Sequence, residues 1–297
     1  QISSVALMDA RSIAATAANK GYLTSATDLA DIEYTHPKYF FDKAIYDRRV
    51  YNGVGKADPS VEIKFGPNIK DWPEMVPLTD NLLLKVASVI HDPVTTTDEL
   101  IPSGETSSYR SNPLGLAEFT LSRKDPEYVG RAKAIQAVEK VREAGECMGK
   151  AFPEVKEVMH AIKEKFEDVC GSNTGVGSTI YAVKPGDGSA REQAASCQKV
   201  LGGWANIAKE YATKRYRSNL INWGMLPFVI DKDFDFDNDD YVFIPGIKDA
   251  VKNKTEVIKA YVVNKNFAEI ELRLGELTDD ERQIITDGCL INYYKYN

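Results

Sequence analysis

The sequence predicts an α/β fold in which helices pack on a mixed, mostly parallel sheet and further strands add a β layer. Hydrophobic residues make up 43% of the 297-residue chain and charged residues 27%, which is typical of a globular protein of one or two domains. Strand-like and helix-like segments alternate between residues 178 and 230, which predicts parallel pairing. Strand-like segments then follow one another between residues 241 and 274, and these predict the added β layer.

The first quarter of the chain differs from this pattern. Residues 4–19 are dense in Ala, Leu, Met and Ile and contain no glycine or proline, which favours a helix. Residues 57–80 contain four prolines, which favour extended, irregular chain. We therefore expect a boundary in that stretch, which separates residues 1–75 from a sheet-containing domain at residues 76–297. Because the first residue is glutamine, we also expect the chain to begin inside a longer polypeptide.

The sheet-containing domain begins with the run NLLLKVASVI (81–90), whose nearly continuous apolar character is typical of a buried strand. Helices are expected at residues 126–144, where Pro126 suits a first turn, and at residues 153–169. The remaining elements are strand 178–185, helix 189–201, strand 204–211, helix 213–223 before Gly224, strands 225–230, 241–247, 255–263 and 267–274, and helix 278–294, where Thr278 and Glu281 have capping-box spacing.

The loop Gly186-Asp187-Gly188 lies between a predicted strand end and a predicted helix start. Ligands of open α/β sheets bind at such places, because backbone amides and the helix dipole can hold an anion there. The same residues also fit a plain glycine turn, since Ser189 and Glu192 have capping-box spacing and Gly202-Gly203 would end the helix. A glycine loop of this kind is a weak signal alone, so both interpretations stay open.

Ser189 would have to lose its proton to act as a base. A helix N-terminus contributes up to about 2 kcal/mol. At about 1.36 kcal/mol per pKa unit, that lowers the pKa of an alcohol by only about 1.5 units. A catalytic serine therefore needs a nearby guanidinium group, a second cation from elsewhere in the fold, and exclusion of water.

The chain as a whole disfavours several other classes of function. A net charge of -7 and a pI near 5.2 argue against a large nucleic-acid surface. Three histidines and four scattered cysteines without a CxxC pair argue against a self-contained metal site and favour a reducing, cytoplasmic environment. No apolar run approaches the roughly 20 residues that span a bilayer.

Two further stretches have an ordinary structural interpretation that we prefer. The acidic run at residues 231–241 suggests calcium, but Asn238 stands where an EF-hand loop requires glycine and Ile244 where it requires glutamate, so we expect a solvated acidic turn. Arg215 and Arg217 lie beside tyrosines and could contact nucleic acid. On a helix of an acidic chain, we expect them to form ion pairs or to cover apolar surface.

Two motifs resemble the aconitase family of iron–sulfur hydro-lyases, specifically its C-terminal swivelling β/β/α domain. Gly186-Asp187-Gly188-Ser189-Ala190-Arg191-Glu192 resembles the family's strand-to-helix turn, and the residues from Ile180 to Pro227 fit the same template. TTDELIPSGETSSYR, which contains Asp98 and Arg110, resembles a second family loop. The resemblance covers about residue 81 to the C-terminus. Residues 1–75 would then be the trailing end of the preceding core domain plus a connector, and residues 123–172 a helical insertion.

The resemblance implies an enzyme that isomerises a hydroxy tricarboxylate, such as citrate and isocitrate, by removing and re-adding water at a 4Fe–4S cluster. Ser189 would be the base, and Arg191 and the main chain of Ala190 would bind a substrate carboxylate. Arg110 would supply the second cation, and Asp98 would support catalysis by ordering its loop and the active-site contacts of that loop. Many family members have serine at the position of Ala190, a change that is tolerable if only the amide is used.

The family's cluster is held by cysteines of the core, two of them as CxxC, and this chain contains no such pair. The cluster ligands are therefore expected on core domains of the same polypeptide, and this chain alone is expected to be inactive. The alternatives are an isopropylmalate- or homoaconitate-type isomerase, a separate small subunit that pairs with a cluster-bearing partner, and a non-catalytic regulatory or RNA-binding module.

Overall fold

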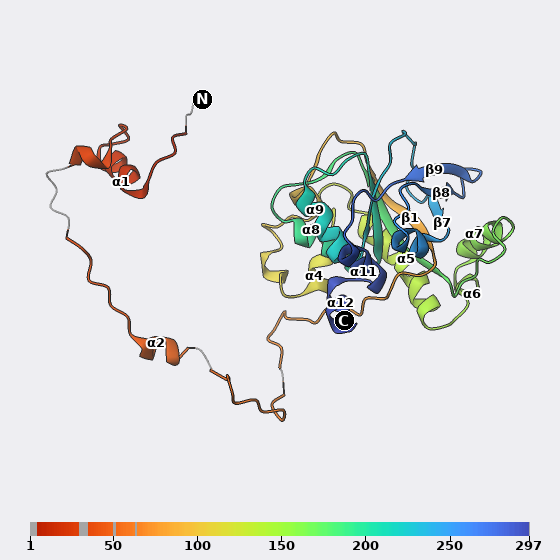
Figure 1. Ribbon diagram of the computed structural model, residues 1–297, viewed down its shortest axis with the longest axis horizontal. Coiled ribbons are helices and arrows are strands. Elements are labelled where there is room, and N and C mark those ends of the chain that lie inside the picture. Colours follow the sequence, from red (N-terminus) through yellow and green to blue (C-terminus); the bar gives the residue numbers. More distant parts are fainter. Residues whose placement is uncertain (1–4, 30–34, 50–51, 63, 297) are drawn as a thin grey trace. The chain divides into compact units, whose positions relative to one another are not determined.

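A computed structural model describes residues 5–29, 35–49, 52–62 and 64–296, and the chain separates into two compact units at residues 1–63 and 64–297. The first unit contains α1 (Ala10–Ala18), a 3-10 helix (Ala26–Leu29) and α2 (Lys43–Asp47) (Figure 1). Ala15 is the one buried residue among those described in this unit. The division between the units falls after residue 63, within the proline-rich stretch but before the expected bound at residues 75/76.

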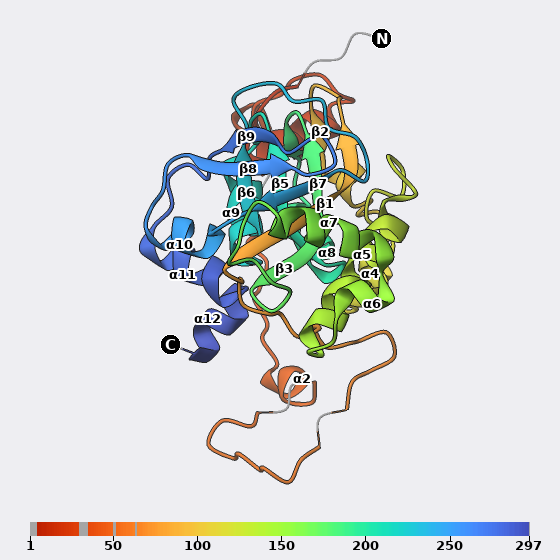
Figure 2. The ribbon, with the colours of Figure 1, turned by 90° about the vertical axis from the view of Figure 1, so that its right-hand side faces the viewer.

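The second unit is built on a sheet that has seven strands in the described part of the chain, in the order β6-β5-β3-β1-β7-β8-β9. β6, β5, β3 and β1 pair in parallel, whereas β7, β8 and β9 continue the same sheet with antiparallel pairing. A bridge between Val229 and Arg273 joins the two edges, so the sheet is curled (Figure 2). The strands are β1 (Asn81–Ile90), β3 (Thr174–Ala182), β5 (Gly203–Ala208), β6 (Leu226–Val229), β7 (Tyr241–Ile244), β8 (Ile258–Val262) and β9 (Ala268–Leu272). The predicted mixed α/β class is confirmed.

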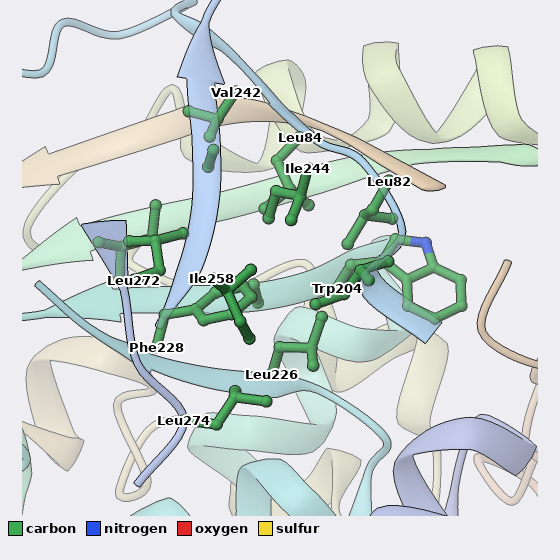
Figure 3. Packing of buried hydrophobic residues seen from close by; sticks show 14 of the residues in the cluster. Leu82, Leu84, Trp204, Leu226, Phe228, Val242, Ile244, Ile258, Leu272 and Leu274 are labelled. Carbon is green, nitrogen blue, oxygen red and sulfur yellow. The ribbon is translucent and has the colours of Figure 1, made fainter. Parts of the chain in front are cut away.

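The main hydrophobic cluster fills the inside of the curled sheet. Leu82 and Leu84 of β1 pack there with Ile244 of β7 and Phe228 of β6 (Figure 3). Leu83, which lies between the two β1 leucines, belongs to a cluster on the outer face. β1 is thus buried on both faces, which explains its nearly continuous apolar sequence.

Four helices cover part of the outer face of the sheet and form the scaffold of the candidate site. They are α3 (Thr97–Leu100), α4 (Pro113–Ala117), α8 (Arg191–Val200) and α9 (Lys214–Asn222). Their apolar residues form a second cluster with the outer face of β1 and β3. α8 packs against both α4 and α9.

The segment predicted as an insertion contains α5 (Tyr128–Glu143), α6 (Met148–Ala151) and α7 (Pro153–Lys163). α5 packs on β1 and β3, and the buried carboxylate of Glu139 accepts a hydrogen bond from the backbone nitrogen of Val176 at 2.8 Å. α5 is therefore part of the core of this unit. α6 and α7 lie at the end of the unit away from α8 and α9 (Figure 1).

The predicted C-terminal helix at residues 278–294 is divided in two, and α10 (Ile247–Lys252) precedes it. α11 (Asp279–Asp287) begins with the predicted capping box of Thr278 and Glu281, and it ends at Gly288, whose φ is +97°. α12 (Leu290–Tyr296) follows. Among the described residues, no helix combines the length and the apolar character needed to cross a lipid bilayer.

Several other predicted bounds are wrong, and tertiary contacts explain most of the differences. α1 begins at Ala10, because the Asp9 carboxylate caps it by accepting hydrogen bonds from two backbone nitrogens. α7 ends at Lys163 rather than at residue 169, and Phe166 packs against the rings of Phe243 and Tyr261. β3 begins at Thr174 rather than at residue 178, since its glycines allow close packing that a propensity argument does not detect.

Residues 64–80 run along the second unit. The backbone nitrogen of Leu78 donates to the carbonyl of Thr286 at 3.0 Å, and the Asn292 side chain donates to the carbonyl of Met75 at 2.7 Å. The rings of Trp72 and Trp223 lie 4.4 Å apart between centroids. This stretch is therefore attached to the C-terminal helices and to the end of α9.

Candidate functional site

A short parallel ribbon brings the two sequence motifs together. β2 (Thr95–Thr96) pairs with β4 (Pro185–Asp187), with Thr95 opposite Pro185 and Thr96 opposite Asp187. β2 leads directly into α3, and β4 leads into α8. We call residues 96–110 the threonine–aspartate loop and residues 186–192 the glycine–serine loop. The two loops are about 90 residues apart in sequence, and the ribbon makes them one structural feature.

The glycines of the second motif are required by packing. Gly186 and Gly188 have φ values of +97° and +123°, which L side chains rarely adopt. A Cβ at Gly186 would lie 2.3 Å from the ring of Tyr216, and a Cβ at Gly188 would lie 2.3 Å from Oγ1 of Thr97. The bare backbone thus lets α3 and α9 approach the loop closely.

The capping box that the spacing of Ser189 and Glu192 allows is not formed. The N-cap of α8 is Ala190, and no side chain caps this helix. The Glu192 carboxylate instead accepts a hydrogen bond from Nε1 of Trp223 at 3.1 Å. Ser189 is exposed, and its hydroxyl takes no part in a helix cap.

Ser189 lies between two cavities. The first, of about 220 Å³, is lined by Ser189 and Ala190 on one side and by residues of the threonine–aspartate loop, including Thr106 and Arg110, on the other. The second, of about 300 Å³, is lined by Ser189, Arg191, Glu192, Arg215, Ser218 and Asn219. The structure thus brings Arg110 and Arg191 to one serine, each in a separate cavity.

The two arginines differ in their surroundings. Arg110 is exposed, and it directly follows the short 3-10 helix Ser107–Tyr109. Arg191 is half-buried, and its Nε atom is buried without a hydrogen-bond partner in the described part of the structure. A buried donor of this kind is costly unless an acceptor satisfies it. Each guanidinium group thus belongs to a residue that lines a cavity together with Ser189.

Asp98 makes contacts that hold together the loop in which it lies. Its carboxylate accepts a hydrogen bond from the backbone nitrogen of Ser103 at 3.1 Å and forms an ion pair with Arg123 at 2.8 Å. Arg123 also pairs with Glu105 at 2.7 Å, and hydrogen bonding to Glu105 together with Asp98 raises the pKa of its guanidinium. Asp98 is in neither cavity lining, so its described contacts order the loop that carries Arg110.

Sequence reasoning missed Arg123 and the position of Arg215. Of the two arrangements expected for the arginines of α9, ion pairs or coverage of apolar surface, no ion pair is found for either residue within the described part of the chain. Arg217 donates to the carbonyls of Leu274 and Glu276, at 2.7 and 2.8 Å. Arg215 is exposed and lines the second cavity beside Arg191. The only sequence signal for this placement is the register of α9, which is fixed by its N-cap, Thr213.

The described residues do not fit an iron–sulfur cluster or another metal centre. Cys197 and Cys289 are buried, Cys147 is exposed and Cys170 half-buried, and all are free. Over the ranges that the structure describes, no group of three or more His, Cys, Asp or Glu could hold a metal ion. In the acidic run at residues 231–241, Asp237 and Asp240 form ion pairs with Lys265 at 2.8 and 3.1 Å.

Comparison with known proteins gives one family model that includes the Ser189 motif, and partial matches to two enzymes. The family model of the aconitase C-terminal domain matches residues 164–233. Aconitate hydratase A of Rickettsia bellii is 30% identical over 131 residues, which is 41% of this chain and 15% of that protein. The methanogen homoaconitase small subunit of Methanocaldococcus jannaschii is 34% identical over 110 residues, which is 37% of this chain and 56% of that subunit. The chain thus matches less than two thirds of either relative.

Among solved structures, the 3-isopropylmalate dehydratase of Methanocaldococcus jannaschii is similar to this chain with a TM-score of 0.44 and 24% sequence identity. The match covers 72% of this chain and 93% of that protein chain. The family model includes Ser189, Ala190 and Arg191, while Asp98 and Arg110 lie outside it and are joined to them by the β2–β4 ribbon. The sequence motif and the family match agree over residues 164–233, which match the C-terminal domain of the aconitase family.

Proposed function

We propose that this chain supplies the swivelling part of an aconitase-type hydro-lyase, which isomerises a hydroxy acid by removing and re-adding water. The observation that carries this proposal is the position of Ser189, which lies at the start of α8 between two cavities that each contain an arginine. The serine and Arg191 also lie within the residues that match the family model.

In this proposal Ser189 removes a proton from a substrate carbon. Its alkoxide needs more stabilisation than a helix N-terminus provides, which is at most about 2 kcal/mol. Arg110 and Arg191 would supply the rest, because two positive charges near the oxygen favour its ionised form. The same two groups, with the backbone amide of Ala190, would bind substrate carboxylates and so hold the reacting carbon near Ser189.

The identity of the substrate is part of the proposal. The homoaconitase small subunit matches with higher identity and over a larger share of its length than aconitate hydratase A does. These relatives support a homoaconitate-type substrate at least as well as citrate and isocitrate. Both belong to the hydroxy tricarboxylates, and an isopropylmalate-type substrate is the remaining alternative.

A partner must complete the active site, since the described residues do not fit the family's 4Fe–4S cluster. We propose that cluster-bearing core domains supply it. They would belong either to the same polypeptide, with residues 1–75 as the end of the core, or to a separate chain, as the relative named a small subunit suggests.

The test is Ser189→Ala in the enzyme assembled with its cluster-bearing core. Loss of a general base lowers turnover by about 100- to 10,000-fold, so we expect kcat to fall by that factor while the circular dichroism spectrum stays unchanged. Ser107→Ala is the matched control, because Ser107 is exposed in the neighbouring loop and lines neither cavity. A wild-type kcat for Ser189→Ala would refute the role of the serine, and turnover by this chain alone would refute the need for a core.

A further inference from the structure

The second cavity beside Ser189 has an unusual composition. All six of its lining residues are polar, and they include two arginines, Arg191 and Arg215, against one carboxylate, Glu192. Glu192 already accepts a hydrogen bond from Trp223. The charged side chains that line the cavity therefore carry a net positive charge, which favours an anionic group.

Arg215 is available for such a group. It is the second residue of α9 and is exposed, and no ion pair or hydrogen bond ties its guanidinium to another described residue. Its neighbour Arg217 is different, because its guanidinium is used by the carbonyls of Leu274 and Glu276. Arg191 lines the same cavity, and its Nε is buried and lacks a partner among the described residues. Both guanidinium groups thus contribute positive charge to one space, and the exposed guanidinium of Arg215 can reach a ligand there.

The candidate substrates differ in the group that would occupy this space. Isocitrate, homoisocitrate and 3-isopropylmalate share a malate skeleton, and their substituents at C3 are carboxymethyl, carboxyethyl and isopropyl respectively. A carboxylate arm could form bidentate hydrogen bonds with an arginine. An isopropyl arm in the same position would displace water from charged groups and give them no partner.

We propose that Arg215 is a specificity-determining residue that binds the carboxylate of the substrate's C3 arm, in the cavity that it shares with Arg191 and Ser189. This inference rests on the proposed function, because it assumes that substrate reacts at Ser189. It adds a residue of α9 to the site, and it selects a hydroxy tricarboxylate over a dicarboxylate with an apolar arm.

The experiment compares wild type, Arg215→Gln and Arg215→Lys in the enzyme assembled with its cluster-bearing core, using isocitrate, homoisocitrate and 3-isopropylmalate. Lys214→Gln is the matched control, because it removes the same charge from the adjacent exposed position and Lys214 does not line the cavity. Inhibition constants replace kcat/KM for any compound that is not turned over.

For Arg215→Gln we compare kcat/KM for the better tricarboxylate with kcat/KM for 3-isopropylmalate. We expect the ratio of the two to fall by a factor of about 10 to 100, mainly because KM for the tricarboxylate rises. Arg215→Lys should restore part of it, and Lys214→Gln should change it less than threefold. An unchanged preference in Arg215→Gln, or a wild-type preference for 3-isopropylmalate, would overturn the inference. If Ser189→Ala also keeps full activity, the proposed function fails as well; if Ser189→Ala is inactive, the role of Arg215 alone is refuted.

Discussion

The proposed chemistry of Ser189 depends on charge more than on the helix that carries it. The sequence motifs point to the serine and the two arginines as candidates, but they do not show the surroundings of these residues. Arg215 was missed because it reaches the cavity beside Arg191 only through the packing of α9 against α8. No local sequence pattern specifies that packing. Asp98 shows both cases, since its partner Ser103 lies five residues away in the sequence, whereas Arg123 lies 25 residues away and was missed.

Lys199 is a second residue whose charge is governed by its surroundings. It is 6% exposed, its Nζ has no hydrogen-bond partner among the described residues, and the ammonium lies 3.9 Å from the ring centroid of Trp204. Burial lowers its pKa from 10.5 to about 8. Between these two values the unfolded chain binds more protons than the folded chain does, so this residue makes stability rise with pH across that window.

We predict that Lys199→Met, which removes the titration and keeps an unbranched side chain, is more stable than wild type at pH 7. This advantage should shrink by on the order of 3 kcal/mol as the pH rises from 7 to 10.5. Urea unfolding at several pH values measures it. Lys140→Met, at an exposed position of α5, serves as the control. An advantage of Lys199→Met that does not change with pH would contradict the prediction.

Local sequence patterns predicted elements well and their ends poorly. Thr278 and Glu281 form the predicted capping box, whereas Ser189 and Glu192, with the same spacing, do not. The difference is tertiary, because Trp223 takes the Glu192 carboxylate and the β4 loop makes Ala190 the N-cap. A further capping box, at Thr96 and Glu99, was not predicted, and it begins the helix that meets Gly188.

The contact between α3 and the glycine loop gives a prediction for Gly188→Ala. A Cβ there would lie 2.3 Å from Oγ1 of Thr97, on a backbone with φ of +123°. We expect a loss of stability of about 1–3 kcal/mol, read as a lower Tm. Adding Thr97→Ala should recover only part of the loss, since the φ strain remains. Gly104→Ala, which meets nothing within 4 Å, is the control. A Tm for Gly188→Ala equal to that of wild type would show that this contact is not tight.

At the scale of the whole molecule, the sequence predicted the α/β class but not the curling of the sheet. The antiparallel pairing of β7 with β1, such as Ile244 opposite Leu82, and the bridge between Val229 and Arg273 join residues far apart in the chain. Periodicity carries no information about such pairs. The ribbon of β2 and β4, which assembles the site, is likewise too short to be recognised from its sequence.

The most direct measurement of the central claim is a crystal structure of the assembled enzyme with its hydroxy-acid substrate bound. We predict that Oγ of Ser189 lies about 3–3.5 Å from the substrate carbon that loses its proton. Arg110 and Arg191 should contact different carboxylates of the same molecule. A substrate bound with Ser189 well beyond contact distance from that carbon, or with neither arginine on a carboxylate, would contradict the account.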